Sequence, residues 1–145
     1  MFNRKEAKKI LEGDQVSPLP SAEVKLFFSL SYCTGLAVET VRELKWENLY
    51  LDKEMIRTVE VDEEDDEEVE VNFDHALTVW IEKLKEKSGA AGDKNYIFTE
   101  ANEEPVTIDT IQKHFESAMG TAGIDFRKRK LTPNSFRRTY NFWYA

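Results

Sequence analysis

The sequence predicts a mainly α-helical fold with one small antiparallel β-sheet (α+β), built as one domain over residues 1–145. Apolar residues recur at helical spacing along most of the chain, whereas the alternation typical of strands is confined to residues 55–61 and 69–71. No internal repeat or low-complexity linker divides the chain. Its 41% hydrophobic residues are enough for one core.

The expected helices begin at residues whose side-chain oxygen can accept a free backbone N–H, and glycine follows several of their ends. These caps are Ser21, Asp74 and either Thr107 or Asp109. The helices are expected at residues 4–12, 22–34, 38–43, 75–87 and 108–119, with one more from Pro133. Two of them show an inward apolar stripe. The stripes are Leu77, Val79 or Trp80, Ile81 and Leu84 in one, and Ile108, Ile111, Phe115, Ala118 and Met119 in the other.

An acidic hairpin is expected at residues 58–71. Its first strand, 55–61, is followed by Asp62–Glu68, which are all acidic, before the partner strand begins at Val69. No glycine, proline or asparagine sets a tight turn there, so we expect a long open tip. Residues 60–70 carry nine carboxylates and no basic residue, which accounts for the formal charge of −8. The rest of the chain is close to neutral and has a basic end.

Composition excludes several classes of protein. No apolar stretch approaches the roughly 20 residues of a membrane helix, and the first residues are polar, so we expect a cytoplasmic protein. The single cysteine, Cys33, excludes an internal disulfide framework. His75 and His114 have no Cys or His at ligand spacing, so we expect surface histidines, no metal site, no cofactor and no small-molecule substrate.

Four short segments occur in an order that points to one family. They are Thr34-Gly35-Leu36 followed by Glu43-Leu44-Lys45-Trp46, then residues 47–51, then Tyr96-Ile97-Phe98, and finally residues 131–140 (LTPNSFRRTY). Together they resemble the catalytic domain of tyrosine recombinases of the phage integrase type. The resemblance implies an integrase-like fold, truncated at its C-terminal end, in a protein from a phage or another mobile element.

The resemblance also implies a set of catalytic positions. In the family, a tyrosine attacks a DNA phosphodiester, two arginines hold the phosphate, and a lysine on the hairpin and histidines transfer protons. The first arginine falls on Ala37, its nearby acidic residue on Thr40 (with Glu39 adjacent), and the histidine of the second box on Asn134. Only the second arginine remains, as Arg137.

The nucleophile and the hairpin lysine also lack counterparts. No lysine occurs between Lys53 and Lys83, and the tyrosine of the family would follow beyond residue 145. Tyr140 falls where the family has an aromatic core residue, and Tyr144 does not match the nucleophile position. We therefore expect a domain that is not an enzyme.

Two functions follow from the charge pattern. The first is an inactive integrase-like domain with at most weak DNA binding. Its candidate DNA-binding residues are Arg127, Lys128, Arg129, Lys130, Arg137 and Arg138. In the simpler alternative, Arg137 is solvated or ion-paired and the run 127–130 pairs with the acidic hairpin, or is solvated, and does not bind DNA.

The second function uses the acidic hairpin, which would repel DNA but suits a basic partner. It would make the chain an interaction or inhibitor protein, of the phage anti-defence type, that mimics nucleic acid. The candidate residues are Asp62, Glu63, Glu64, Asp65, Asp66, Glu67 and Glu68. The simpler alternative is a solvated loop. The apolar end at Phe142, Trp143 and Tyr144 is a candidate surface for oligomerisation.

Overall fold

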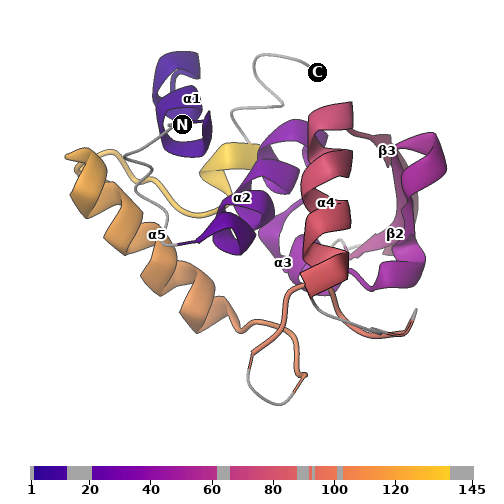
Figure 1. Cartoon of the computed structure of the whole chain (residues 1–145). Coiled ribbons are helices and arrows are strands. Elements are labelled where there is room, and N and C mark those ends of the chain that lie inside the picture. Colours follow the sequence, from indigo (N-terminus) through magenta and orange to yellow (C-terminus); the bar gives the residue numbers. More distant parts are fainter. Residues whose placement is uncertain are drawn as a thin grey trace.

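The computed structural model describes residues 2–12, 21–61, 66–87, 92, 94–100 and 103–137. It confirms a mainly helical fold with a small antiparallel sheet (Figure 1). The helices are α1 (Arg4–Glu12), α2 (Ala22–Thr34), α3 (Val38–Arg42), α4 (His75–Lys87) and α5 (Ile108–Ala122). The strands are β1 (Leu49–Tyr50), β2 (Met55–Val61) and β3 (Asp66–Asn72), with short 3₁₀ turns at Trp46–Asn48 and Leu51–Lys53.

Helix α2 lies at the centre of the molecule (Figure 1). The Ser21 side chain accepts the Val24 N–H and caps its first turn, as the sequence predicts. Residues 26–32 are all buried, including both serines, so the helix is surrounded by protein on every side. Gly35 ends α2 in the left-handed region at φ 77°.

An aromatic cluster joins Phe2, which precedes α1, and helices α2 and α5 to residues 131–137. The Phe2 ring stacks on Phe136 with centroids 4.6 Å apart, and Phe115 of α5 meets Phe2 edge-on at 6.3 Å. Phe28 of α2 also packs against Phe136, with ring centroids 5.4 Å apart. Because Phe136 is 1% exposed, this cluster fixes residues 131–137 against the core. The chain is helical at 135–137, close to the predicted helix start at Pro133.

The sheet has the order β1-β2-β3 and is antiparallel throughout. Pairing of β2 with β3 runs from Met55↔Asn72 to Val61↔Asp66, so β3 begins three residues before the predicted Val69. The expected open tip over Asp62–Glu68 is therefore wrong for Asp66, Glu67 and Glu68. Strand propensity is context-dependent, and backbone pairing extends through exposed acidic positions.

Two predicted inward positions are also wrong. Ile108 is 46% exposed at the first turn of α5, and Val79 is 38% exposed on α4 together with its alternative Trp80 at 36%. The buried residues of α4 are Leu77, Thr78 and Ile81. Thr78 can be buried because its hydroxyl donates to Glu54 Oε2 at 2.8 Å. Tyr96 forms an isolated antiparallel bridge to Lys45, and Ile97 and Phe98 are buried as predicted, but the chain bends at these two residues and forms no continuous strand.

Candidate nucleic-acid interface

The loop between α2 and α3 is held rigidly by local hydrogen bonds. The Ser31 hydroxyl donates to the Leu36 carbonyl at 2.7 Å, and the Thr34 hydroxyl accepts the Leu36 N–H at 3.2 Å. Both side chains are buried, and a left-handed Gly35 lies between them and Ala37. The backbone groups of residues 35–38 therefore have fixed directions.

Asn134 ties the segment 131–137 to the start of α3. Its side-chain oxygen accepts the Val38 N–H at 2.8 Å, and its amide donates to both carboxylate oxygens of Glu39 at 3.1 and 3.0 Å. Glu39, and not the matched position Thr40, makes this link, because Thr40 is buried at 8% exposure. An asparagine at position 134 thus serves as a clamp between two segments that are distant in sequence.

Arg137 also contacts this loop. Its Nε donates to the Gly35 carbonyl at 2.8 Å, and its Nη2 lies 3.2 Å from Glu60 Oε1. The Arg137 side chain is 36% exposed and that of Glu60 is 20% exposed. This guanidinium is therefore bound to protein groups on two of its nitrogens.

Glu60 comes to this place from the acidic hairpin. Alternation along β2 puts it on the same face as Ile56, which is fully buried, so the core fixes the direction of the Glu60 side chain. The oxygen that meets Arg137 also accepts the Ala37 N–H, at 3.2 Å. One carboxylate oxygen thus joins the hairpin, the α2–α3 loop and the segment 131–137.

The basic run is divided by the structure. Arg129 makes a paired contact with the Glu6 carboxylate of α1, with one distance of 2.8 Å, and the hydrogen bond from Arg129 lowers the pKa of Glu6. The same hydrogen bond raises the pKa of Arg129. Arg127 is 83% exposed and lies at 3.9 Å from Glu116, and Lys128 and Lys130 are exposed. Arg129 therefore docks α1, while the other three point to solvent.

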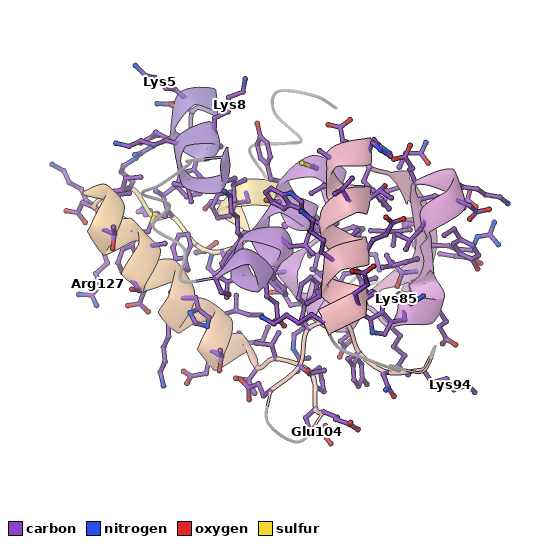
Figure 2. The ribbon with its side chains drawn as sticks, in the orientation of Figure 1. Lys5, Lys8, Lys85, Lys94, Glu104 and Arg127 are labelled. Atoms are coloured by element: carbon purple, nitrogen blue, oxygen red, sulfur yellow. The ribbon has the colours of Figure 1, made fainter. Side chains whose placement is uncertain are left out.

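Helix α1 adds lysines that the sequence analysis did not include. Lys5, Lys8 and Lys9 are exposed and recur at helical spacing, opposite the buried face of Ala7, Ile10 and Leu11. The Arg129–Glu6 contact brings them beside the basic run, and Figure 2 shows Lys5, Lys8 and Arg127 pointing outward. We call the set the basic surface. It comprises Lys5, Lys8, Lys9, Arg127, Lys128 and Lys130.

The basic run and the acidic hairpin are engaged with different parts of the chain. In the described residues, the ion pairs of the run join it to Glu6 and Glu116. Those of the hairpin join it to Arg137 and to Arg57, which pairs with Glu70 across the two strands. Figure 1 shows the hairpin and α5 on opposite sides of α2. Among the described residues, the basic run therefore does not pair with the acidic hairpin, which is the alternative that the sequence analysis kept.

Some predicted site residues lie outside the described residues. These are Asp62, Glu63, Glu64, Asp65, Arg138, Tyr140 and the apolar end 142–144. Among the residues that are described, no three His, Cys, Asp or Glu side chains are grouped to hold a metal ion. In the same residues, no helix is long and apolar enough to cross a membrane.

The family is decided by a match over the whole sequence. The sequence model of the phage integrase family matches residues 1–145. This chain belongs to the phage integrase family. No curated protein sequence matches this integrase-family chain.

Solved structures share the fold of this integrase-family chain. A XerA recombinase superposes with a TM-score of 0.75 at 19% identity, over 96% of this chain and 48% of that one. The Tn1549 transposon integrase in complex with circular intermediate DNA gives 0.67 at 13% identity, over 97% and 51%. The same integrase with transposon right end DNA gives 0.66 at 14% identity, over 94% and 49%. The chain thus spans about half the length of these structures.

Proposed function

We propose that this chain is an integrase-family domain that binds DNA through its basic surface and does not cleave it. The observation that carries the proposal is the state of Arg137, whose guanidinium is bound by Glu60 and by the Gly35 carbonyl. At the matched position of the other family arginine, Ala37 offers only a methyl group and an N–H, and that N–H is also bound to Glu60.

This arrangement is poorly suited to stabilising a phosphoryl-transfer transition state. Such a state concentrates negative charge, and each missing charge partner commonly lowers the rate by about 10²–10³. Here the one guanidinium is already balanced by a carboxylate 3.2 Å away. The hairpin, which carries the family's proton-donating lysine, carries carboxylates and no lysine between Lys53 and Lys83. These losses together support a domain that does not break DNA strands.

The basic surface is suited to DNA binding without sequence readout. Lysine and arginine side chains that contact phosphates release condensed counterions, which gives affinity that falls steeply with salt. Six such side chains from α1 and from the run 127–130 are exposed on adjoining elements. The structurally similar Tn1549 integrase was solved in complex with DNA, which supports the same class of partner for this chain.

Fluorescence anisotropy of a labelled duplex, titrated at two salt concentrations, tests the DNA-binding half of the proposal. The variant Lys128→Gln with Lys130→Gln is expected to weaken binding and to reduce the slope of log K against log salt by about one to two. The matched control is Lys85→Gln with Lys94→Gln, which removes the same charge from the side opposite Arg127 (Figure 2). Equal losses in both variants, or no binding at low salt, would contradict it.

A nicked duplex tests the other half, because a nick traps any covalent intermediate that forms. After incubation with the chain, denaturing gel electrophoresis is expected to show free DNA only. A protein–DNA adduct that survives denaturation would overturn the claim that the domain does not cleave DNA, whatever the binding assay shows.

A second function, binding of a basic protein by the acidic hairpin, is supported by two exposed side chains. Glu67 and Glu68 lie on β3, away from the basic run, and are exposed. The test is competition, in which the chain displaces a labelled duplex from an unrelated basic DNA-binding domain. The variant Glu67→Gln with Glu68→Gln should compete less well. Equal competition by the variant, or none by the native chain, would sink this function.

A further inference from the structure

The Glu60 carboxylate is held as a bound anion by groups from two other segments of the chain. Its Oε1 accepts the Ala37 N–H and lies 3.2 Å from Arg137 Nη2. The guanidinium is itself aimed by its second contact, from Nε to the Gly35 carbonyl at 2.8 Å. A positively charged fork and a backbone N–H thus converge on one oxygen atom.

The donors in this arrangement do not depend on Glu60 for their positions. Ala37 N–H is directed by the rigid loop at residues 34–37, and Arg137 follows Phe136, which is buried in the aromatic cluster. Guanidinium and N–H groups bind phosphate oxygens as readily as carboxylate oxygens. If the carboxylate withdrew, the remaining donors would still form a site for a tetrahedral oxyanion.

The structure of the hairpin explains why the Glu60 carboxylate stays next to Arg137. Ile56 anchors β2 in the core, and pairing through Val61↔Asp66 fixes the register, so Glu60 always faces the loop. Its direct cross-strand partner is Glu67, which lies on the same face. Glu67 is exposed, whereas the Glu60 side chain next to Arg137 is 20% exposed.

We propose that Arg137 and the Ala37 N–H form an oxyanion site whose resident ligand is the chain's own Glu60 carboxylate, which keeps phosphate out of it. The site itself follows from these contacts. Its identification as a place where a DNA phosphate is excluded rests on the proposed function. In the native chain DNA is held by the basic surface, and the Arg137 site is blocked from within.

Titration of inorganic phosphate into the full chain labelled with ¹⁵N tests this proposal without DNA. The signals followed are the Ala37 amide and the Arg137 Nε–H. In Glu60→Gln these two signals should move together at a phosphate concentration at least about tenfold lower than in the native chain, because a competing charged ligand has been removed. Adding Arg137→Gln to Glu60→Gln should abolish the response.

The matched control is Glu67→Gln, which removes one negative charge from the paired position on the same face of the hairpin. It should respond to phosphate as the native chain does. Glu60→Asp provides a second test should Glu60→Gln fold poorly. It keeps the charge but shortens the side chain, and it should show a smaller gain in phosphate affinity.

Several results would overturn the proposal. The first is a phosphate titration of Glu60→Gln or Glu60→Asp that matches that of the native chain. The second is a gain in phosphate affinity in Glu67→Gln as large as that in Glu60→Gln. The third is a phosphate response that persists when Arg137→Gln is added. Failure of duplex binding would leave the phosphate result untouched, because the titration contains no DNA. Equally, loss of the phosphate response would leave salt-dependent duplex binding by the basic surface intact, so the two proposals fail separately.

Discussion

Replacing Arg137 with alanine should lower the free energy of unfolding, because the side chain holds two other segments of the chain. The substitution removes the donor to the Gly35 carbonyl at 2.8 Å and the partner of Glu60 at 3.2 Å. A hydrogen bond from a charged donor contributes about 1.5–3 kcal/mol. The ion pair adds about 0–1 kcal/mol, at the lower end because the Arg137 side chain is 36% exposed. The expected loss is therefore about 2–3 kcal/mol.

Urea unfolding followed by circular dichroism measures this loss, and thermal unfolding should show a fall in Tm of about 7–10 °C for a chain of this size. Arg127→Ala is the matched control, since that side chain is 83% exposed and should change stability by no more than about 0.5 kcal/mol. A double-mutant cycle with Glu60→Gln should give a small coupling, about 0–0.5 kcal/mol, between the two side chains.

The reasoning would be refuted if Arg137→Ala and Arg127→Ala had the same small effect. Arg137 would then be a solvated surface residue, free to bind phosphate, and the contacts with Gly35 and Glu60 would have no energetic weight.

Three further substitutions test local contacts by urea unfolding. Glu6→Gln should lose about 1 kcal/mol at neutral pH, and this loss should shrink as the pH falls below 4.5. Arg129 holds the Glu6 pKa below its ordinary 4.5, so this stability is present above 4.5 and is lost as the pH falls through the lowered pKa. An equal loss of stability at neutral and at acid pH would contradict this role of Glu6. Asn134→Asp should cost about 1–2 kcal/mol at neutral pH, because a second carboxylate then faces Glu39, and should recover in acid. A loss of stability that persists in acid would exclude charge repulsion between Asp at position 134 and Glu39 as its cause. Gly35→Ala should cost about 1 kcal/mol at φ 77°, and no change would mean that the loop relaxes.

Local sequence signals predicted most of the helices and β2 with accurate bounds. Ser21 and Thr107 cap α2 and α5, and Gly35 ends α2, because capping depends on neighbouring residues only. The start of β3 was missed because an acidic run has low strand propensity, whereas pairing with β2 decides its structure. Helical spacing alone places Ile108 on the inward face, but spacing does not show that the first turn of α5 lies outside the core.

The site could be predicted only in part, because its contacts join residues about 100 positions apart. The resemblance assigns Ala37, Asn134 and Arg137 to one set of family positions, whereas the hydrogen bonds of Asn134 and Arg137 to residues 35–38 come from the structure. The sequence shows Glu60 only as one carboxylate of the hairpin, and the structure shows that its side chain turns inward to Arg137. The lysines of α1 join the basic surface through the Arg129–Glu6 contact, which no local pattern predicts.

The central claim is that DNA meets the basic surface while Arg137 remains bound to Glu60. The most direct measurement is the ¹H–¹⁵N spectrum of the arginine Nε–H groups before and after addition of a saturating duplex. We predict that the Arg127 signal moves and that the Arg137 signal keeps its position. Movement of Arg137 with Arg127 unchanged would contradict the claim, and would mean that DNA displaces Glu60 and binds at the matched family position.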